Sequence, residues 1–160
     1  MEPGAIGAAA VRKQNRNGNV SYRSRKLDTY NYKATNQRAE IFAIIVALKW
    51  AMDVYKKLNN SPRIHVTIHS DSRYAVKCMN EWLAKWLHNG WTTSANGPVA
   101  NRDILQDAID AENRILNAGN VSYSNNLRFV TVIVTLRNIV VIQCNSATST
   151  IIDVVAIKSL

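Results

Sequence analysis

The chain has 160 residues and a formal net charge of +9 at pH 7. This length fits one domain with its own buried core, and the positive charge favours a polyanionic partner, although a basic protein without such a partner has the same composition. Two cysteines without a secretory signal indicate a reduced, intracellular compartment rather than a disulfide framework. The most apolar stretch, 129–142, is interrupted by polar residues and is too short for a membrane span, so we expect no membrane association.

The first third of the chain predicts a hairpin followed by a helix. Two stretches, 4–11 and 20–25, flank the turn signal Asn-Gly-Asn at 17–19 and indicate paired strands. A helix is expected to begin at Thr35 or Asn36 as its N-cap. Apolar residues then follow at helical spacing, at Ile41, Ile44, Ile45, Leu48, Met52 and Tyr55. We expect this helix to bury one face against a sheet.

The middle of the chain predicts one strand and two further helical segments. Polar and apolar residues alternate over 63–70 as in a half-buried strand, and this strand ends at Asp71. Ser72 follows as an N-cap of the next helix. A loop that ends at Pro98 precedes another amphipathic helix over 103–116. Two strands, a helix, a strand and then helices predict an α/β layered domain.

The composition changes at residue 121. From there to residue 160 the chain is rich in Val, Ile, Thr and Asn, is almost uncharged, and contains neither Gly nor Pro. Residues 130–136 alternate like a strand, but a long uncharged β-branched stretch also has the signature of an aggregation-prone segment. We therefore predict a domain over 1–124 and an atypical C-terminal segment over 125–160.

Four motifs follow one another along the chain. They are TNQRAE at 35–40, the strand that ends in Asp71-Ser72, a run that interleaves aromatic and basic residues at 82–91, and PVAN at 98–101. In this order and spacing the set resembles ribonuclease H of type 1, and more the cellular eukaryotic kind, over about residues 3 to 120. The resemblance implies a ribonuclease H-like α/β fold, with a mixed central sheet flanked by helices and incomplete at both ends.

The resemblance also implies a metal site. In this family four acidic residues hold two Mg²⁺ ions, and Glu40 and Asp71 match two of the four, with Mn²⁺ as an alternative metal. Without the resemblance, Glu40 is also explained as a first-turn carboxylate favoured by the helix dipole, and Asp71 as a turn or cap residue. The motifs that carry the other two acidic residues have no match. Asp153 is the remaining acidic residue in the C-terminal segment, and its neighbours fit poorly.

Eight residues match positions that bind the hybrid in this family. Asn36 and Gln37 match residues that contact 2′-hydroxyls of the RNA strand. Thr35 and Asn101 match a pocket for a phosphate of the DNA strand, and Lys33 stands where some members carry Arg. The channel along the DNA strand is matched by Trp82, Trp86 and Ser94. Both tryptophans also lie at helical spacing, so they fit a hydrophobic core equally well.

These assignments lead to one expected function and two alternatives. The expected function is hydrolysis of the RNA strand of RNA/DNA hybrids by two-metal-ion catalysis in a monomeric protein. The first alternative is a module that binds the hybrid without cleaving it, and the second is a truncated, non-functional product. The sequence does not distinguish a nuclear, cytoplasmic or mitochondrial location.

Overall fold

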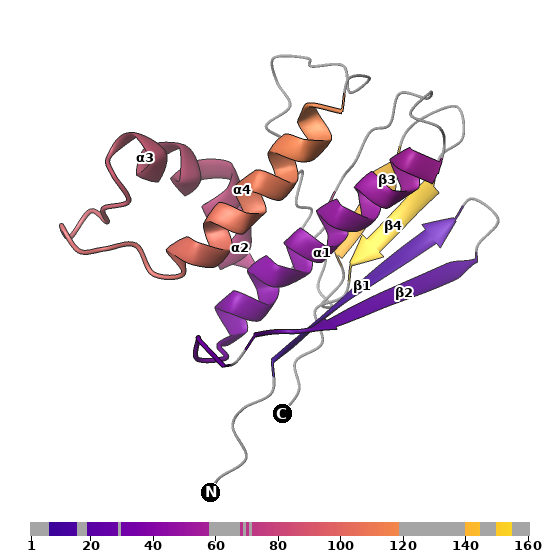
Figure 1. Cartoon of the computed structure of the whole chain (residues 1–160), viewed down its shortest axis with the longest axis horizontal. Coiled ribbons are helices and arrows are strands. Elements are labelled where there is room, and N and C mark those ends of the chain that lie inside the picture. The colour runs from indigo at the N-terminus through magenta and orange to yellow at the C-terminus, as the bar shows by residue number, and fades with distance from the viewer. Residues whose placement is uncertain are drawn as a thin grey trace, which may run out of the picture.

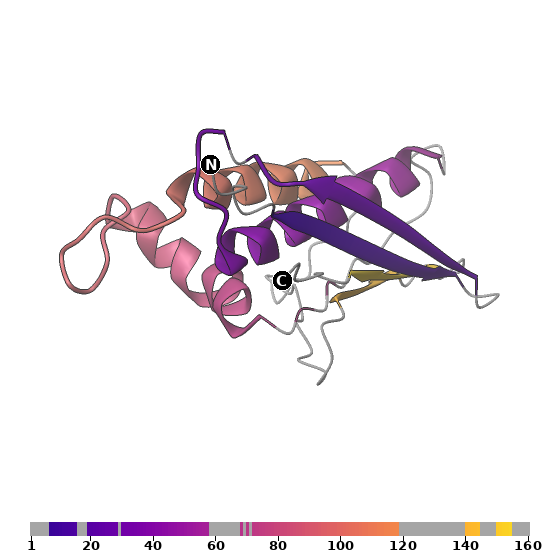
Figure 2. The same ribbon diagram turned by 90° about the horizontal axis from the view of Figure 1, so that it is seen from below.

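A computed structural model describes residues 7–15, 19–28, 30–57, 68, 70, 72–118, 140–144 and 150–154, of which 14, 15, 140–144 and 150–154 are described by their backbone alone. The elements in chain order are β1 (Ala8–Asn15), β2 (Val20–Lys26), α1 (Asn36–Lys57), α2 (Arg73–Lys77), η1 (Cys78–Trp82), α3 (Leu83–His88), α4 (Arg102–Leu116), β3 (Val140–Cys144) and β4 (Thr150–Val154). Helices α1 and α4 lie side by side, and α1 covers one face of the sheet (Figures 1 and 2). The predicted α/β class is therefore confirmed.

The sheet has the strand order β2-β1-β4-β3, and every pairing among the described strands is antiparallel. The predicted hairpin is confirmed, with Ala8 opposite Lys26 and Gln14 opposite Val20. β1 extends beyond the predicted end at residue 11, because its ladder with β2 continues through polar residues as far as Gln14. The predicted strand over 63–70 lies mostly outside the described residues, and the alternating stretch at 130–136 lies entirely outside them.

Helix α1 begins where its N-cap was predicted. The Thr35 Oγ1 atom accepts a hydrogen bond from the Arg38 backbone N–H at 3.2 Å, and the Thr35 carbonyl accepts one from Ala39 at 3.0 Å. The helix packs against β1 on one side and α4 on another, so it buries more than one stripe. Its fully buried side chains Ile41 and Ile44 lie in the same core as Leu105 of α4.

The helix predicted after Ser72 is observed, but it is not regular. Ser72 is its N-cap, since the Ser72 Oγ atom accepts a hydrogen bond from the Ala75 N–H at 3.1 Å. α2, η1 and α3 then follow without a break, and η1 is a π-helical turn that the sequence did not predict. α4 begins at Arg102, close to the predicted start. In the described part of the chain, no helix is long and apolar enough to cross a membrane.

Candidate functional site

Glu40 of the TNQRAE motif is linked to the segment that carries Asp71. The Ser72 hydroxyl donates a short hydrogen bond to the Glu40 Oε2 atom, while the same oxygen caps α2. The Ser72 N–H in turn donates to the Ser70 Oγ atom at 3.1 Å, and both serines are buried. Asp71, which stands between the two serines in the sequence, lies outside the described residues. The start of α2 is thus fixed to the second turn of α1.

This position rules out one explanation of Glu40. Glu40 is the fifth residue of α1, and the first turn of that helix contains no acidic residue. The interpretation of Glu40 as a first-turn carboxylate stabilised by the helix dipole is therefore wrong, because that stabilisation falls off within the first turn. Glu40 is partly buried instead, and its described polar contact is with a serine hydroxyl.

Carboxylate oxygens are the ligands that Mg²⁺ prefers, so Glu40 is chemically suited to such a site. Across the ranges that the structure describes, no group of three or more His, Cys, Asp or Glu side chains gathers around one point. Asp71 and the side chain of Asp153 both fall outside those ranges. Cys78 is not a candidate ligand or nucleophile, because burial raises the pKa of its thiol to about 11.

Five of the eight predicted hybrid-binding residues lie where two helices begin. Lys33, Thr35, Asn36 and Gln37 are all exposed at the start of α1, and Asn101, the N-cap of α4, is partly exposed. The N-terminus of a helix presents unpaired backbone N–H groups and a partial positive charge, and both favour binding of an anion such as a phosphate. The predicted phosphate pocket of Thr35 and Asn101 would therefore be formed by the N-terminal ends of α1 and α4.

An ion pair fixes these two helix starts to each other. The Arg38 Nη1 and Nη2 atoms donate to Oδ1 and Oδ2 of Asp103 at 2.8 and 2.6 Å, across 65 positions in the chain. The same guanidinium stacks on the Tyr32 ring, 4.3 Å from its centroid. The hydrogen bonds from Arg38 lower the pKa of the Asp103 carboxyl, and the pKa of Arg38 is raised in turn.

The sequence analysis missed these three residues, although one signal was present. Arg38 precedes Ile41 by three positions and Ile45 by seven, so it continues the apolar stripe of α1 and is only 7% exposed. An arginine on a buried stripe needs an acidic partner in the fold, because an unpaired buried charge is costly. The sequence alone does not reveal which carboxylate supplies that partner.

Trp82, Trp86 and Trp91 form a row of ring contacts along η1, α3 and the following loop. The ring centroids of Trp82 and Trp86 are 5.6 Å apart, and those of Trp86 and Trp91 are 6.4 Å apart. Trp82 and Trp86 are partly buried and pack against the core, so they are neither fully core nor fully exposed. The Asn101 Nδ2 atom donates a hydrogen bond to the Tyr74 hydroxyl at 3.3 Å, and the Tyr74 ring contacts that of Trp82. Asn101 is thereby linked to the row. Ser94 is exposed in the loop beyond the row.

A model of the family described as RNase H matches residues 1–120. The chain belongs to the RNase H family. The four motifs all lie within the matched residues, as do Glu40 and every predicted hybrid-binding residue. The predicted membership in this family and its α/β fold are thereby confirmed.

Curated proteins named ribonuclease H are similar to this chain. The protein of Francisella tularensis subsp. novicida is 35% identical over 112 residues, which cover 70% of this chain and 64% of that protein. The Chlorobaculum parvum protein is 35% identical over 86 residues, 53% of each chain. The Schizosaccharomyces pombe protein is 38% identical over 93 residues, 58% of this chain and 31% of that protein. The chain thus spans about half the length of the first two bacterial relatives that it matches.

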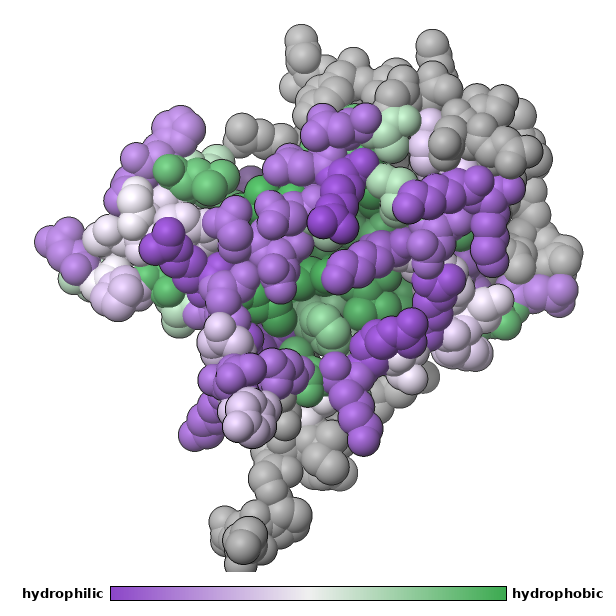
Figure 3. Space-filling view, viewed as in Figure 1, coloured by the Kyte–Doolittle hydropathy of each residue, from purple (hydrophilic) through white to green (hydrophobic). Residues whose placement is uncertain are grey.

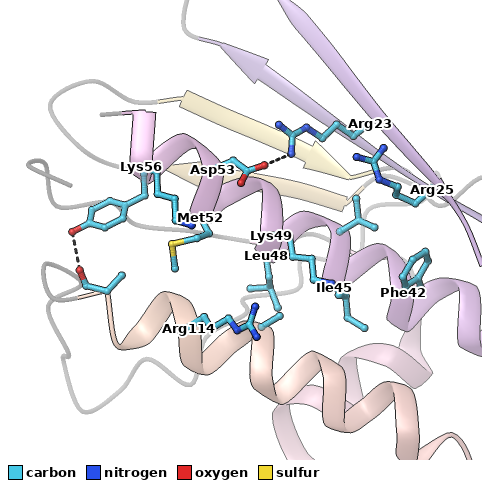
Figure 4. Close-up of a pocket in the computed structure, with 14 residues that line it drawn as sticks. Arg23, Arg25, Phe42, Ile45, Leu48, Lys49, Met52, Asp53, Lys56 and Arg114 are labelled. Atoms are coloured by element: carbon cyan, nitrogen blue, oxygen red, sulfur yellow. Dashed lines mark hydrogen bonds and ion pairs between the residues drawn. The ribbon is translucent and has the colours of Figure 1, made fainter. Parts of the chain in front are cut away.

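A separate groove lies on the outer side of α1. It has a volume of about 680 Å³, and its apolar floor between α1 and α4 is surrounded by hydrophilic side chains (Figures 3 and 4). Its cationic lining residues are Arg23, Arg25, Lys49, Lys56 and Arg114. Lys49 follows Glu40 by nine residues, which is about two and a half turns, so the groove faces away from Glu40. It is not part of the candidate site of this RNase H domain.

Proposed function

We propose that this chain hydrolyses the RNA strand of RNA/DNA hybrids with the help of divalent metal ions, Mg²⁺ in the first place and Mn²⁺ as a substitute. One observation carries the proposal: Glu40 of the TNQRAE motif binds Ser72, the residue bonded to Asp71. Two motifs whose acidic residues are 31 positions apart in sequence are thus joined by a hydrogen bond between Glu40 and the residue that follows Asp71. The metal dependence expected of the RNase H family gives these carboxylates a role.

Glu40 and Asp71 would hold the metal through their carboxylate oxygens. The bound metal would supply an activated water and would neutralise the charge that develops on the leaving oxygen. Ser72 keeps the Glu40 carboxylate in one orientation, because its hydroxyl is itself fixed by the cap of α2. Ser70 supports that arrangement by accepting the Ser72 N–H. The chain therefore contributes a carboxylate whose position is set before a metal arrives.

The hybrid would bind across the starts of α1 and α4. Asn36 and Gln37 are exposed and carry amide groups that can donate to and accept from 2′-hydroxyls, which only the RNA strand has. Thr35, Asn101 and Lys33 would hold a phosphate of the DNA strand at the two helix N-termini. The partly exposed rings of the channel residues Trp82 and Trp86, with Ser94 beyond them, would extend the contact along the same strand.

A cleavage assay on a labelled RNA/DNA hybrid in Mg²⁺ tests the proposal. We expect cleavage by the 160-residue chain and its loss in Glu40→Gln and in Asp71→Asn. Asp110→Asn is the matched control, because Asp110 is an exposed carboxylate on α4 and should leave the rate unchanged. Hybrid affinity is measured in parallel by fluorescence anisotropy without metal. No cleavage with retained affinity would replace the proposal with a hybrid-binding module, and loss of both would refute it.

We also propose the domain boundary at residue 124. The RNase H family model ends at residue 120, which agrees with the change of composition at residue 121. The segment after the boundary is nevertheless joined to the sheet, because β4 pairs with β1 at Gln14 and Asn15. We therefore regard residues 125–160 as an addition to the edge of the domain and not as a second domain.

A further inference from the structure

Arg38 lies at the point where three parts of the predicted hybrid-binding surface meet. Its two Nη atoms hold Asp103, the second residue of α4, and its guanidinium face covers the Tyr32 ring. Its own backbone N–H donates to the side chain of the N-cap Thr35. One side chain thus connects the loop before α1, the start of α1 and the start of α4.

These three parts carry the groups that would contact different strands of a hybrid. The loop and the start of α1 carry Lys33, Asn36 and Gln37, whereas α4 begins directly after Asn101. Contacts to two strands bind more tightly when the distance between them is fixed before the ligand arrives, because less freedom is lost on binding. An ion pair with two parallel hydrogen bonds and a stacked ring fixes both the distance and the orientation.

We propose that Arg38 is a positioning residue that sets the spacing between the RNA-contacting residues of α1 and the phosphate-contacting Asn101. This inference rests on the proposed hybrid binding. Arg38 does not contact a phosphate itself, because its side chain is buried and both of its Nη atoms are bound to Asp103. Its charge is compensated inside the protein, so its effect on the hybrid is geometric.

Geometric and electrostatic roles predict different salt dependence. A cation that contacts a phosphate adds close to one unit to the slope of log affinity against log salt, because it releases a counterion. Removing a positioning residue lowers the affinity at every salt concentration and leaves that slope unchanged. A purely structural role predicts a third result, in which affinity falls only when the protein becomes less stable.

The experiment compares two paired substitutions in the full chain. The test variant is Arg38→Met with Asp103→Leu, which replaces the ion pair by apolar side chains of similar size and commonly preserves stability. The matched control is Arg23→Met with Asp53→Leu, which removes another Arg–Asp pair, with a 2.6 Å contact, from the groove on the outer side of α1. In the control pair Arg23 also stacks on an aromatic ring, that of Trp50, 4.7 Å from its centroid.

We expect the test variant to bind a hybrid about tenfold more weakly than wild type, with an unchanged salt slope and an unfolding midpoint close to that of wild type. The control variant should bind like wild type. Arg38→Lys keeps the charge but loses the fork and the stack, so it should bind about as weakly as the test variant. Tyr32→Leu removes only the stack from an exposed residue and should weaken binding about threefold in a folded protein, whereas Tyr32→Phe should not.

Wild-type affinity in the test variant or in Arg38→Lys would overturn the positioning role while leaving the proposed function intact. A salt slope lower by about one unit would also overturn it, in favour of a direct phosphate contact. If the test variant does not fold, Arg38→Lys and Tyr32→Leu decide, and unchanged affinity in either of them counts against the proposal. Absence of hybrid binding by wild type would refute the proposed function and this inference with it.

Discussion

Ser72→Ala removes a hydroxyl that has two roles at once. In the wild-type protein this hydroxyl accepts the Ala75 N–H as the N-cap of α2 and donates to the Glu40 carboxylate. Loss of a serine cap costs about 1 kcal/mol, and loss of a hydrogen bond to a charged group costs about 1.5 to 3 kcal/mol. Glu40 is only partly buried, so water compensates for part of the second cost. We expect the free energy of unfolding to fall by about 2 kcal/mol.

The assay is urea unfolding followed by tryptophan fluorescence, with Ser72→Thr as the matched variant. For a domain of this size the loss corresponds to a fall in Tm of about 4 to 8 °C. Ser72→Thr retains a hydroxyl and should recover most of the stability. In a double-mutant cycle with Glu40→Ala, the coupling between the two positions should be about 1 kcal/mol. Ser72→Ala should also slow hybrid cleavage, because the carboxylate loses its fixed orientation. A loss below about 0.5 kcal/mol, or no coupling to Glu40, would refute this account.

Three further predictions concern other parts of the chain. The pKa of Asp103 is lowered in the folded protein, so its contribution to stability should be complete above the unfolded pKa and should be lost as the pH falls through the folded pKa. In Asp103→Asn the free energy of unfolding should therefore depend less steeply on pH below about pH 4. The folded protein should react slowly with iodoacetamide at pH 8 through Cys78, whose pKa is raised to about 11, and rapid alkylation there would contradict its burial. Residues 1–124 alone should bind the hybrid within about threefold of the full chain, because β4 pairs with β1 at Gln14 and Asn15, far along the chain from the residues proposed to bind the hybrid; a larger loss would show that the segment over 125–160 supports the site.

The elements that the sequence predicted best are those whose signals are local. The hairpin followed from a turn signal between two strands, and α1 and α4 followed from helical spacing with a cap at Thr35. The C-terminal strands were not predicted, because the alternation at 130–136 was the strand signal considered and the described strands β3 and β4 lie beyond it. The polar cluster Asn-Ser-Ala-Thr-Ser at 145–149 stands between the two strands in the sequence, and a cluster of this kind is a signal that could have located them.

Of the candidate site, the sequence predicted only the residues that belong to motifs. Motif positions identified Glu40 and the exposed residues at the start of α1, but no local pattern joins Arg38 to Asp103 or Ser72 to Glu40. Those contacts depend on how α1, α2 and α4 pack. The π-helical turn η1 could not be predicted either, because one extra residue in a turn leaves helical spacing of the apolar residues before it and after it. The predicted roles of Asp71 and of the eight binding residues stay predictions.

The first two turns of α1 connect the proposed hybrid-binding surface to the proposed carboxylate site. Arg38 and Glu40 are two residues apart, so their side chains point in directions about 200° apart around the helix. Arg38 holds α4 on one side, and Glu40 contacts the start of α2 on the other. A shift of this short segment would therefore change both the spacing of the proposed phosphate pocket and the position of the Glu40 carboxylate. Thr35→Ala removes the cap that begins the segment as well as a proposed phosphate contact, so it should lower hybrid affinity through both losses and the cleavage rate through the cap, whereas Glu40→Gln should lower the rate alone.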